Sequence, residues 1–180
     1  MYQEEIFTMR TPDRVSLAKA RPITTRQLAK AGLIAALYAV LTVFMPVPQY
    51  GAIQFRVAEA MTVLPFLFPE AVLGLTVGCF IANLFSPFLL DCVIGTSATL
   101  LAALWTSRVK NPLLAPMPPV VCNAVIIGGE IAWFAAQDGE NFLRAWLLNG
   151  VTVGFGELLA CYLLGLLLLQ TLRRTLRHNA

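Results

Sequence analysis

The feature that most constrains this chain is a series of apolar runs that are long enough to cross a lipid bilayer. Backbone in hydrocarbon must be hydrogen-bonded within a helix or a closed barrel. These runs are long and lack strict alternation of polar and apolar residues, so we predict helices. A span needs about 20 apolar residues, with about 17 to 25 tolerated. Six runs are candidates, the second of them short: 27–46, 54–68, 69–86, 89–107, 115–136 and 144–171.

Composition supports a membrane environment. The chain is 58% hydrophobic and 13% charged, and its mean hydropathy is +0.72. A soluble domain of similar size carries about 25% charged residues. The net charge of +3 is too small to indicate nucleic-acid binding. We therefore expect an all-α integral membrane protein formed by a single bundle of about six transmembrane helices in the lipid bilayer.

Local signals place several helix ends. Thr24 and Gln27 have the spacing of a capping box at the start of the first run. Pro69 suits the first turn of the third helix. The segments 111–119, "NPLLAPMPP", and 137–141, "QDGEN", have the composition of turns.

Basic residues indicate the orientation in the membrane. With a cytoplasmic N-terminus, all Lys and Arg residues except Arg56 and Arg144 fall in segments on the cytoplasmic side. This is the positive-inside pattern, which predicts an even number of spans and two cytoplasmic termini in the plasma membrane. We expect a disordered cytoplasmic tail at 1–23, a transmembrane domain at 24–172 and a basic cytoplasmic tail at 173–180.

Polar side chains within the apolar runs are candidates for a substrate site. An ionisable group at membrane depth costs several kcal/mol, about 2.5 to 3.5 on insertion scales, and such groups face the bundle interior or a cavity. On the predicted topology most of them lie in the outer half, where a receptor for an external small molecule would place its contacts. The candidates are Arg56, Glu59, Asn83, Asp91, Asn123, Glu130, Asn149 and Glu157.

Structural roles remain open for five of these residues. Arg56 and Glu59 are three residues apart on one helix face, so they have the alternative of neutralising each other. Asp91 has the alternative of interacting with the dipole of its own helix at the N-terminus. Asn83 and Asn123 have the alternative of forming hydrogen bonds between helices.

Glu130 and Glu157 are harder to explain structurally, since neither has an obvious cationic partner on its own helix. We predict that they bind substrate. Paired carboxylates also perform acid–base catalysis, but no nucleophile–base pair or metal-ligand cluster accompanies them in the sequence. A binding protein is therefore favoured over an enzyme.

Motifs for cofactors and nucleotides are missing from the sequence. There is no GxxxxGK[ST] phosphate loop, no HExxH and no GxSxG. The four cysteines occur singly in apolar stretches, which is typical of packing residues. No cofactor and no metal are predicted. Without an ATP-binding motif of its own, the chain either depends on a partner protein for energy or facilitates transport without an energy source. The cysteines are Cys79, Cys92, Cys122 and Cys161.

Small residues form a stripe on the first helix. Ala31, Ala35 and Ala39 repeat every four residues, with Gly32 and Ala36 beside them. Such stripes allow two helix backbones to approach closely. The sequence leaves open whether this stripe packs inside the bundle or against a partner protein.

Four sequence blocks resemble the QueT family. They are "YGAIQFRVAEAMTVLPFLFPEAVLGLTVGCFIANLFS", "LDCVIGTSATLLAAL", "LAPMPPVVCNAVIIGGE" and "GFGELLACYLLG", and the resemblance extends from about Thr25 to Leu169. Members are proposed queuosine-precursor transporters, classed as substrate-capture (S) components of energy-coupling factor transporters. The resemblance implies a six-helix bundle that binds 7-deazaguanines such as preQ0, preQ1 or queuine. It also implies one transmembrane coupling protein and two ATPases as partners, with Ala31, Ala35 and Ala39 matching the family's AxxxA contact motif.

The chemistry of such a ligand suits the polar residues. A 7-deazaguanine ring presents a ring N–H and an exocyclic amine side by side, and one carboxylate accepts hydrogen bonds from both. Its carbonyl needs a donor such as an Asn amide or Arg56, and Tyr50 or Phe55 would stack on its face. The ammonium group of preQ1 would form an ion pair with a second carboxylate. The alternatives are a solitary facilitator or permease for another nucleobase or vitamin, and a membrane scaffold.

Overall fold

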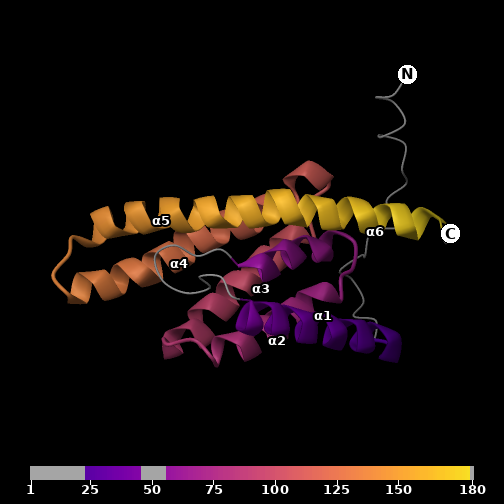
Figure 1. The fold of residues 1–180 in the computed structure, drawn as a ribbon, viewed down its shortest axis with the longest axis horizontal. Coiled ribbons are helices and arrows are strands. Elements are labelled where there is room, and N and C mark those ends of the chain that lie inside the picture. Colours follow the sequence, from indigo (N-terminus) through magenta and orange to yellow (C-terminus); the bar gives the residue numbers. More distant parts are fainter. Residues whose placement is uncertain (1–22, 46–55, 179–180) are drawn as a thin grey trace, which may run out of the picture.

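The regular elements of the chain are all helical in the residues that the structure describes. The computed structural model describes residues 23–45 and 56–178 (Figure 1). Four helical segments are long and apolar enough to cross a membrane, and Val57–Phe66 and Ala71–Asn83 are shorter apolar helices. The predicted class, an all-α multi-pass membrane protein, agrees with this architecture. The order is α1 (Thr25–Phe44), η1 (Val57–Phe66), α2 (Ala71–Asn83), η2 (Leu89–Cys92), α3 (Ile94–Thr106), η3 (Pro112–Leu114), α4 (Met117–Gln137), α5 (Phe142–Leu158), η4 (Leu159–Gly165) and α6 (Leu166–His178).

Several predicted boundaries are confirmed. The capping box of α1 is formed, with the Gln27 backbone N–H 3.3 Å from Thr24 Oγ1 and the Thr24 N–H 3.0 Å from Gln27 Oε1. The turn at 137–141 separates α4 from α5, and Gly139 adopts a φ of 92°, in the left-handed region that favours glycine. Pro69 lies in the turn just before α2 rather than within its first turn.

Helices α1 and α2 pack closely through the small-residue stripe. A Cβ added to Gly74 would lie 2.6 Å from the Ala31 carbonyl oxygen, and one added to Gly78 would lie 2.7 Å from that of Ala35. Ala31 and Ala35 are accordingly buried, and Ala39 is half-buried. In this chain, therefore, Ala31 and Ala35 face α2, and interior packing describes them better than exposure to a partner.

The second apolar run does not form the predicted α-helix at 54–68. Its described part is a 3₁₀ helix, Val57–Phe66, about 20 Å long at roughly 2.0 Å per residue. Ala58 to Pro65 are all buried, and η1 contacts η4, α3, α1 and α6. This run was short for a span, and the structure makes it a central element surrounded by other helices. Residues 54 and 55 lie outside the described part of the chain.

The last apolar run forms one long helix. Helices α5, η4 and α6 are continuous from Phe142 to His178, and Figure 1 shows them extending along one side of the bundle. Residues 159–165 are π-helical. Gly165 lies against η1, since a Cβ there would be 2.9 Å from Val63 Cγ1. The basic segment predicted as a C-terminal tail continues this helix through His178.

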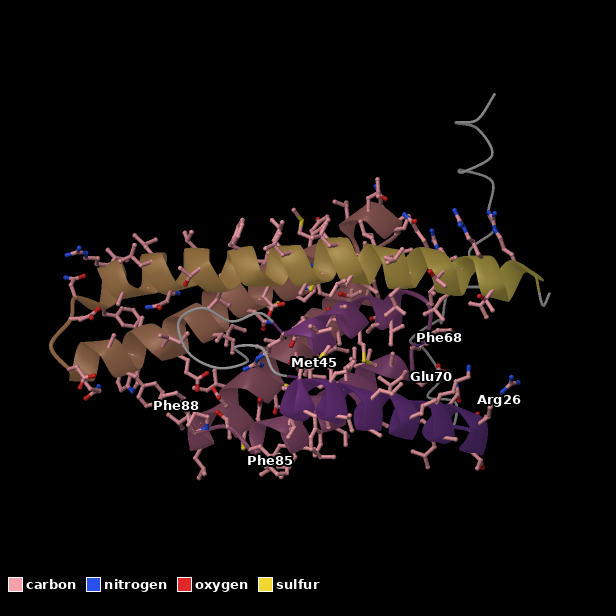
Figure 2. All side chains as sticks on the ribbon, in the orientation of Figure 1. Arg26, Met45, Phe68, Glu70, Phe85 and Phe88 are labelled. Carbon is pink, nitrogen blue, oxygen red and sulfur yellow. The ribbon has the colours of Figure 1, made fainter. Side chains whose placement is uncertain are left out.

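Basic residues gather at one end of the bundle. The N-terminus of α1 and the C-terminus of α6 lie toward the same end (Figure 1), and Figure 2 places Arg26 and Glu70 toward that end and Phe88 toward the opposite one. Lys30 forms a 3.0 Å ion pair with Glu70 there. The guanidinium carbon of Arg173 lies 4.9 Å from the centre of the Phe66 ring. These contacts tie α1 to the segment between η1 and α2, and α6 to the last residue of η1.

Candidate functional site

The polar residues chosen from the sequence face the interior of the bundle. Seven of the eight membrane-depth candidates are buried, at 1–7% exposure, and Asn149 is half-buried. They form two groups, which we name by their positions. The central cluster consists of Tyr38, Arg56, Glu59, Thr62, Asn123, Glu157 and Cys161. The outer cluster consists of Asn83, Ser86, Asp91 and Glu130, and it adjoins Phe88, which Figure 2 shows toward the end remote from Arg26.

Two carboxylates of the central cluster are held by donors from other helices. The Tyr38 hydroxyl on α1 donates to Oε1 of Glu59 on η1. The Asn123 amide on α4 donates to Glu157 Oε1 on α5 at 2.9 Å. Oε2 of Glu59, by contrast, is buried and has no hydrogen-bond partner among the described residues. The cluster thus keeps one strong acceptor unused.

Cys161 connects the Glu157 carboxylate to the Glu59 backbone. Its Sγ lies 3.6 Å from Glu157 Oε2 and 3.5 Å from the Glu59 carbonyl oxygen. The Thr62 hydroxyl lies 3.7 Å from the same sulfur. The π-helical stretch begins two residues before Cys161, and such stretches are common at functional sites. Cys161, expected as a packing residue, is buried and also contacts polar groups of the cluster.

Arg56 acts on more than its sequence neighbour. Its side chain is 4% exposed, and it interacts electrostatically with Glu59, Glu157 and Glu130. In the sequence it is the sole Lys or Arg between Lys30 and Arg108. A simple structural pair with Glu59 accounts for only part of this environment, because one guanidinium faces several carboxylates.

The outer cluster joins α2, η2 and α4. The Asn83 amide donates to the Asp91 backbone carbonyl at 2.7 Å, and the Ser86 hydroxyl donates to Asp91 Oδ2. The carboxyl groups of Glu130 and Asp91 interact electrostatically and are close enough to hydrogen-bond to each other when one carries a proton. Both Glu130 carboxylate oxygens, and Oδ1 of Asn83, are buried without a hydrogen-bond partner among the described residues. The cluster is rich in acceptors that the protein itself leaves unsatisfied.

An aromatic pair lies next to the outer cluster. The rings of Phe88 and Phe134 have centroids 5.1 Å apart. Phe88 precedes Asp91 by three residues, and Phe134 follows Glu130 by four, one turn along α4. Through this apolar contact the start of η2 packs against α4. The predicted stacking residues Tyr50 and Phe55 lie outside the described residues.

The hydrogen bond of Asn149 does not connect it to either cluster. Its amide donates to the Ala145 carbonyl of its own helix at 2.8 Å. It lies beside a close approach of α4 and α5, since a Cβ added to Gly128 would be 2.7 Å from the Gly150 Cα. This contact gives Asn149 a local role in α5 and leaves a substrate role as a prediction.

Several residues of the two clusters were missed by sequence reasoning. Tyr38 follows Ala31 and Ala35 on one helical face, so its hydroxyl had a detectable signal as a polar group on a buried stripe. Ser86 and the ring pair had none, because their positions depend on how η2 packs against α4. The site therefore extends beyond the charged residues that the apolar background made conspicuous.

Comparisons with known proteins agree with the resemblance in the sequence. A family model described as the QueT transporter matches residues 28–174. The curated queuosine precursor transporter QueT of Lactococcus lactis subsp. cremoris (strain MG1363) is 33% identical over 78 residues, which are 42% of this chain and 46% of that protein. The chain thus matches about half the length of this curated relative. No solved structure matched the chain.

Proposed function

This chain belongs to the QueT transporter family, and from that membership we propose that it captures queuosine precursors for uptake. The ligands are 7-deazaguanines such as preQ0, preQ1 or queuine. The chain acts as a substrate-binding subunit of the plasma membrane, energised by a separate module of one transmembrane coupling protein and two ATPases. It binds its ligand without transforming it chemically.

The observation that carries this proposal is the set of unsatisfied buried acceptors. Both oxygens of Glu130, Oε2 of Glu59 and Oδ1 of Asn83 lack a partner among the described residues. Leaving a buried acceptor unpaired costs about 1–3 kcal/mol. A ligand that brings several N–H donors to these atoms recovers that free energy on binding. A 7-deazaguanine ring, with its ring N–H groups and exocyclic amine, has this donor-rich character.

Other features suit the ring as well. The single carbonyl of the ring needs a donor, and the buried guanidinium of Arg56 provides one near Glu59. Asn123 already donates to Glu157, so Asn123 and Glu157 support the site from α4 and α5. Proposed roles in substrate binding extend to Asp91 and, less directly, to Asn149.

The proposed topology has six spans with both termini in the cytoplasm. The gathering of Lys30 and Arg173 near the ends of α1 and α6 supports it. The positive-inside rule then makes this end cytoplasmic and the outer cluster external. On this orientation the unsatisfied acceptors of Asn83 and Glu130 lie on the side from which the ligand arrives.

The proposed contact with the coupling protein lies on α1. The predicted motif residues Ala31 and Ala35 face α2, so their exposure would require α1 to separate from α2. Their neighbours Gly32 and Ala36 are exposed, and a Cβ at Gly32 would meet nothing within 4 Å. We therefore place the contact on the face of Gly32 and Ala36, with the half-buried Ala39 at its edge.

Mass spectrometry of small molecules that copurify with the protein tests the proposal. The protein is purified from cells supplied with 7-deazaguanines and denatured to release its ligand. A released 7-deazaguanine supports the proposal. A different nucleobase or a vitamin, recovered reproducibly in its place, would assign the chain to another substrate.

A further inference from the structure

The site is poor in positive charge, which limits the ligands it suits. We infer that it selects a ligand carrying an ammonium group, so that 7-aminomethyl-7-deazaguanine (preQ1) binds in preference to the neutral 7-cyano compound (preQ0). The outer cluster receives the ammonium group, and the central cluster receives the ring. This inference rests on the proposed function and adds the charge and orientation of the ligand.

The first argument is the charge balance inside the bundle. Four carboxyl groups, those of Glu59, Asp91, Glu130 and Glu157, are at most 7% exposed, and Arg56 interacts electrostatically with those of Glu59, Glu130 and Glu157. One guanidinium neutralises one of the four. Buried ionised carboxylates are costly unless they are paired, so a carboxyl group without a counter-charge takes up a proton instead. A cationic ligand supplies the counter-charge with which such a group ionises and binds it, whereas a neutral ligand supplies none.

The second argument is the chemistry of the unsatisfied atoms. In the described part of the chain, every buried side-chain nitrogen or oxygen without a hydrogen-bond partner is an oxygen. These atoms are Glu59 Oε2, Asn83 Oδ1, Thr96 Oγ1, Glu130 Oε1 and Glu130 Oε2. Thr96 Oγ1 is a hydroxyl outside both clusters, and the other four atoms are carboxyl or amide oxygens of the site, which therefore requires donors from its ligand. The cyano group of preQ0 is an acceptor and satisfies none of them, whereas an ammonium group has three N–H donors and no acceptor.

The third argument places the ammonium group at the outer cluster. Neither Glu130 oxygen meets hydrogen-bond geometry with a described residue, yet its carboxyl group is close enough to that of Asp91, whose Oδ2 accepts from Ser86, for the two to hydrogen-bond when one is protonated. A hydrogen bond between the two carboxyl groups would require a proton on one of them, and a bound cation removes that requirement. Oδ1 of Asn83 is an independent sign of a missing donor. It is buried and unpaired on a side chain that is 1% exposed, and the same side chain donates to the Asp91 carbonyl.

The surroundings favour a charge interaction at this position. The Phe88–Phe134 pair lies one turn beyond Glu130 along α4 and contributes apolar surface beside the carboxylates. Asp91 and Glu130 are themselves only 7% and 6% exposed, and a group removed from water feels a lower dielectric constant, which strengthens its attraction to an ammonium group. The ring then extends inward, where Oε2 of Glu59 accepts from its N–H groups and Arg56 donates to its carbonyl.

Calorimetric titration of the purified full chain with preQ1 and with preQ0 tests the inference. We expect preQ1 to bind about 10- to 100-fold more tightly, the range for a charge-assisted hydrogen bond. Glu130→Gln should remove most of this preference by weakening preQ1 while leaving preQ0 nearly unchanged. Asp91→Asn should shift the preference in the same direction. Glu70→Gln, the same substitution at the Lys30 ion pair at the opposite end, is the matched control and should leave both affinities unchanged.

The outcomes separate this inference from the function beneath it. Equal affinities for preQ1 and preQ0, or a Glu130→Gln variant that weakens both to the same extent, would overturn the inference and leave the proposed function standing. Binding of neither compound by the wild-type chain would overturn the proposed function and the inference together. Gel filtration establishes whether each variant is folded. If the Glu130→Gln variant is not folded, the Asp91→Asn variant decides the question.

Discussion

Helix α1 presents small residues on two faces, and we predict that bulk on each face has a different consequence. Ala31 and Ala35 lie on the face toward α2. Gly32 and Ala36 lie on an exposed face. The perturbation is one leucine pair on each face, Ala31→Leu with Ala35→Leu and Gly32→Leu with Ala36→Leu. Both pairs add large apolar side chains to the same two turns, so each controls for the other.

The geometry sets the magnitude for the inner pair. The backbone of α1 at Ala31 and Ala35 is so close to α2 that one added methyl at Gly74 or Gly78 would lie 2.6 or 2.7 Å from it. The atoms in contact at these points belong to the backbone, which cannot move aside as the end of a flexible side chain can. Overpacking costs about 1–3 kcal/mol per site, so the inner pair should lose roughly 2–6 kcal/mol of stability if the two sites add. Ligand affinity should fall with it, because α1 also carries Tyr38.

The outer pair should leave the isolated protein nearly unchanged. A Cβ at Gly32 meets no atom within 4 Å, and leucine is favoured over glycine in a helix by up to about 1 kcal/mol. The branched side chains would instead hold a partner helix away from α1. We expect normal thermal stability and ligand affinity, with a large loss of uptake and of copurification with the ATPase-bearing module.

Thermal unfolding in detergent, ligand calorimetry and cellular uptake are measured on both pairs. Full uptake by the outer pair would remove this face of α1 from the coupling contact. Unchanged stability of the inner pair would contradict the close packing of α1 on α2. Uptake by the wild-type chain in cells that lack the ATPase module would instead favour a solitary transporter.

Three further predictions concern the interior. Tyr38→Phe removes the donor to Glu59 and should lower the unfolding free energy by about 1–3 kcal/mol, measured by denaturation; an unchanged value would mean that Glu59 finds another donor. Arg56→Ala should lower the unfolding free energy by about 3–5 kcal/mol, because it leaves buried carboxylates without their cation. The double change Arg56→Ala with Glu59→Ala should cost less than the sum of the two single changes. Additivity in this double-mutant cycle would show that the two residues do not interact. Gly165→Ala places a methyl group 2.9 Å from Val63 Cγ1 and should destabilise the protein by about 1–3 kcal/mol; a stability gain in thermal unfolding would show that η4 does not pack tightly on η1.

The sequence predicted the helical class and the interior position of the polar residues for clear physical reasons. Backbone in hydrocarbon has few allowed structures, and charged groups avoid lipid. Turn residues and the capping box at Thr24 marked the helix ends by local chemistry that does not depend on packing. The burial of Glu59, Glu130 and Glu157 followed from the same cost of exposing charge to lipid.

The packing of particular faces was less predictable. In a membrane protein both the interior and the lipid-facing surface are apolar, so hydrophobic periodicity does not separate them. For this reason the sequence allowed the stripe of Ala31 and Ala35 to be assigned to a partner protein, whereas in the structure it faces α2. The 3₁₀ form of Val57–Phe66 and the π-helical stretch before Gly165 depend on contacts between distant segments. No local pattern in the sequence distinguishes either from an ordinary α-helix.

The central claim is that buried, unpaired acceptors inside this bundle form a binding site for a 7-deazaguanine. The most direct measurement is calorimetric titration of the purified wild-type chain, alone in detergent, with preQ1 and with the unrelated neutral nucleobase thymine. The account predicts saturable binding of preQ1 at a single site and none of thymine. Failure of preQ1 to bind to a folded, ligand-free sample would contradict it.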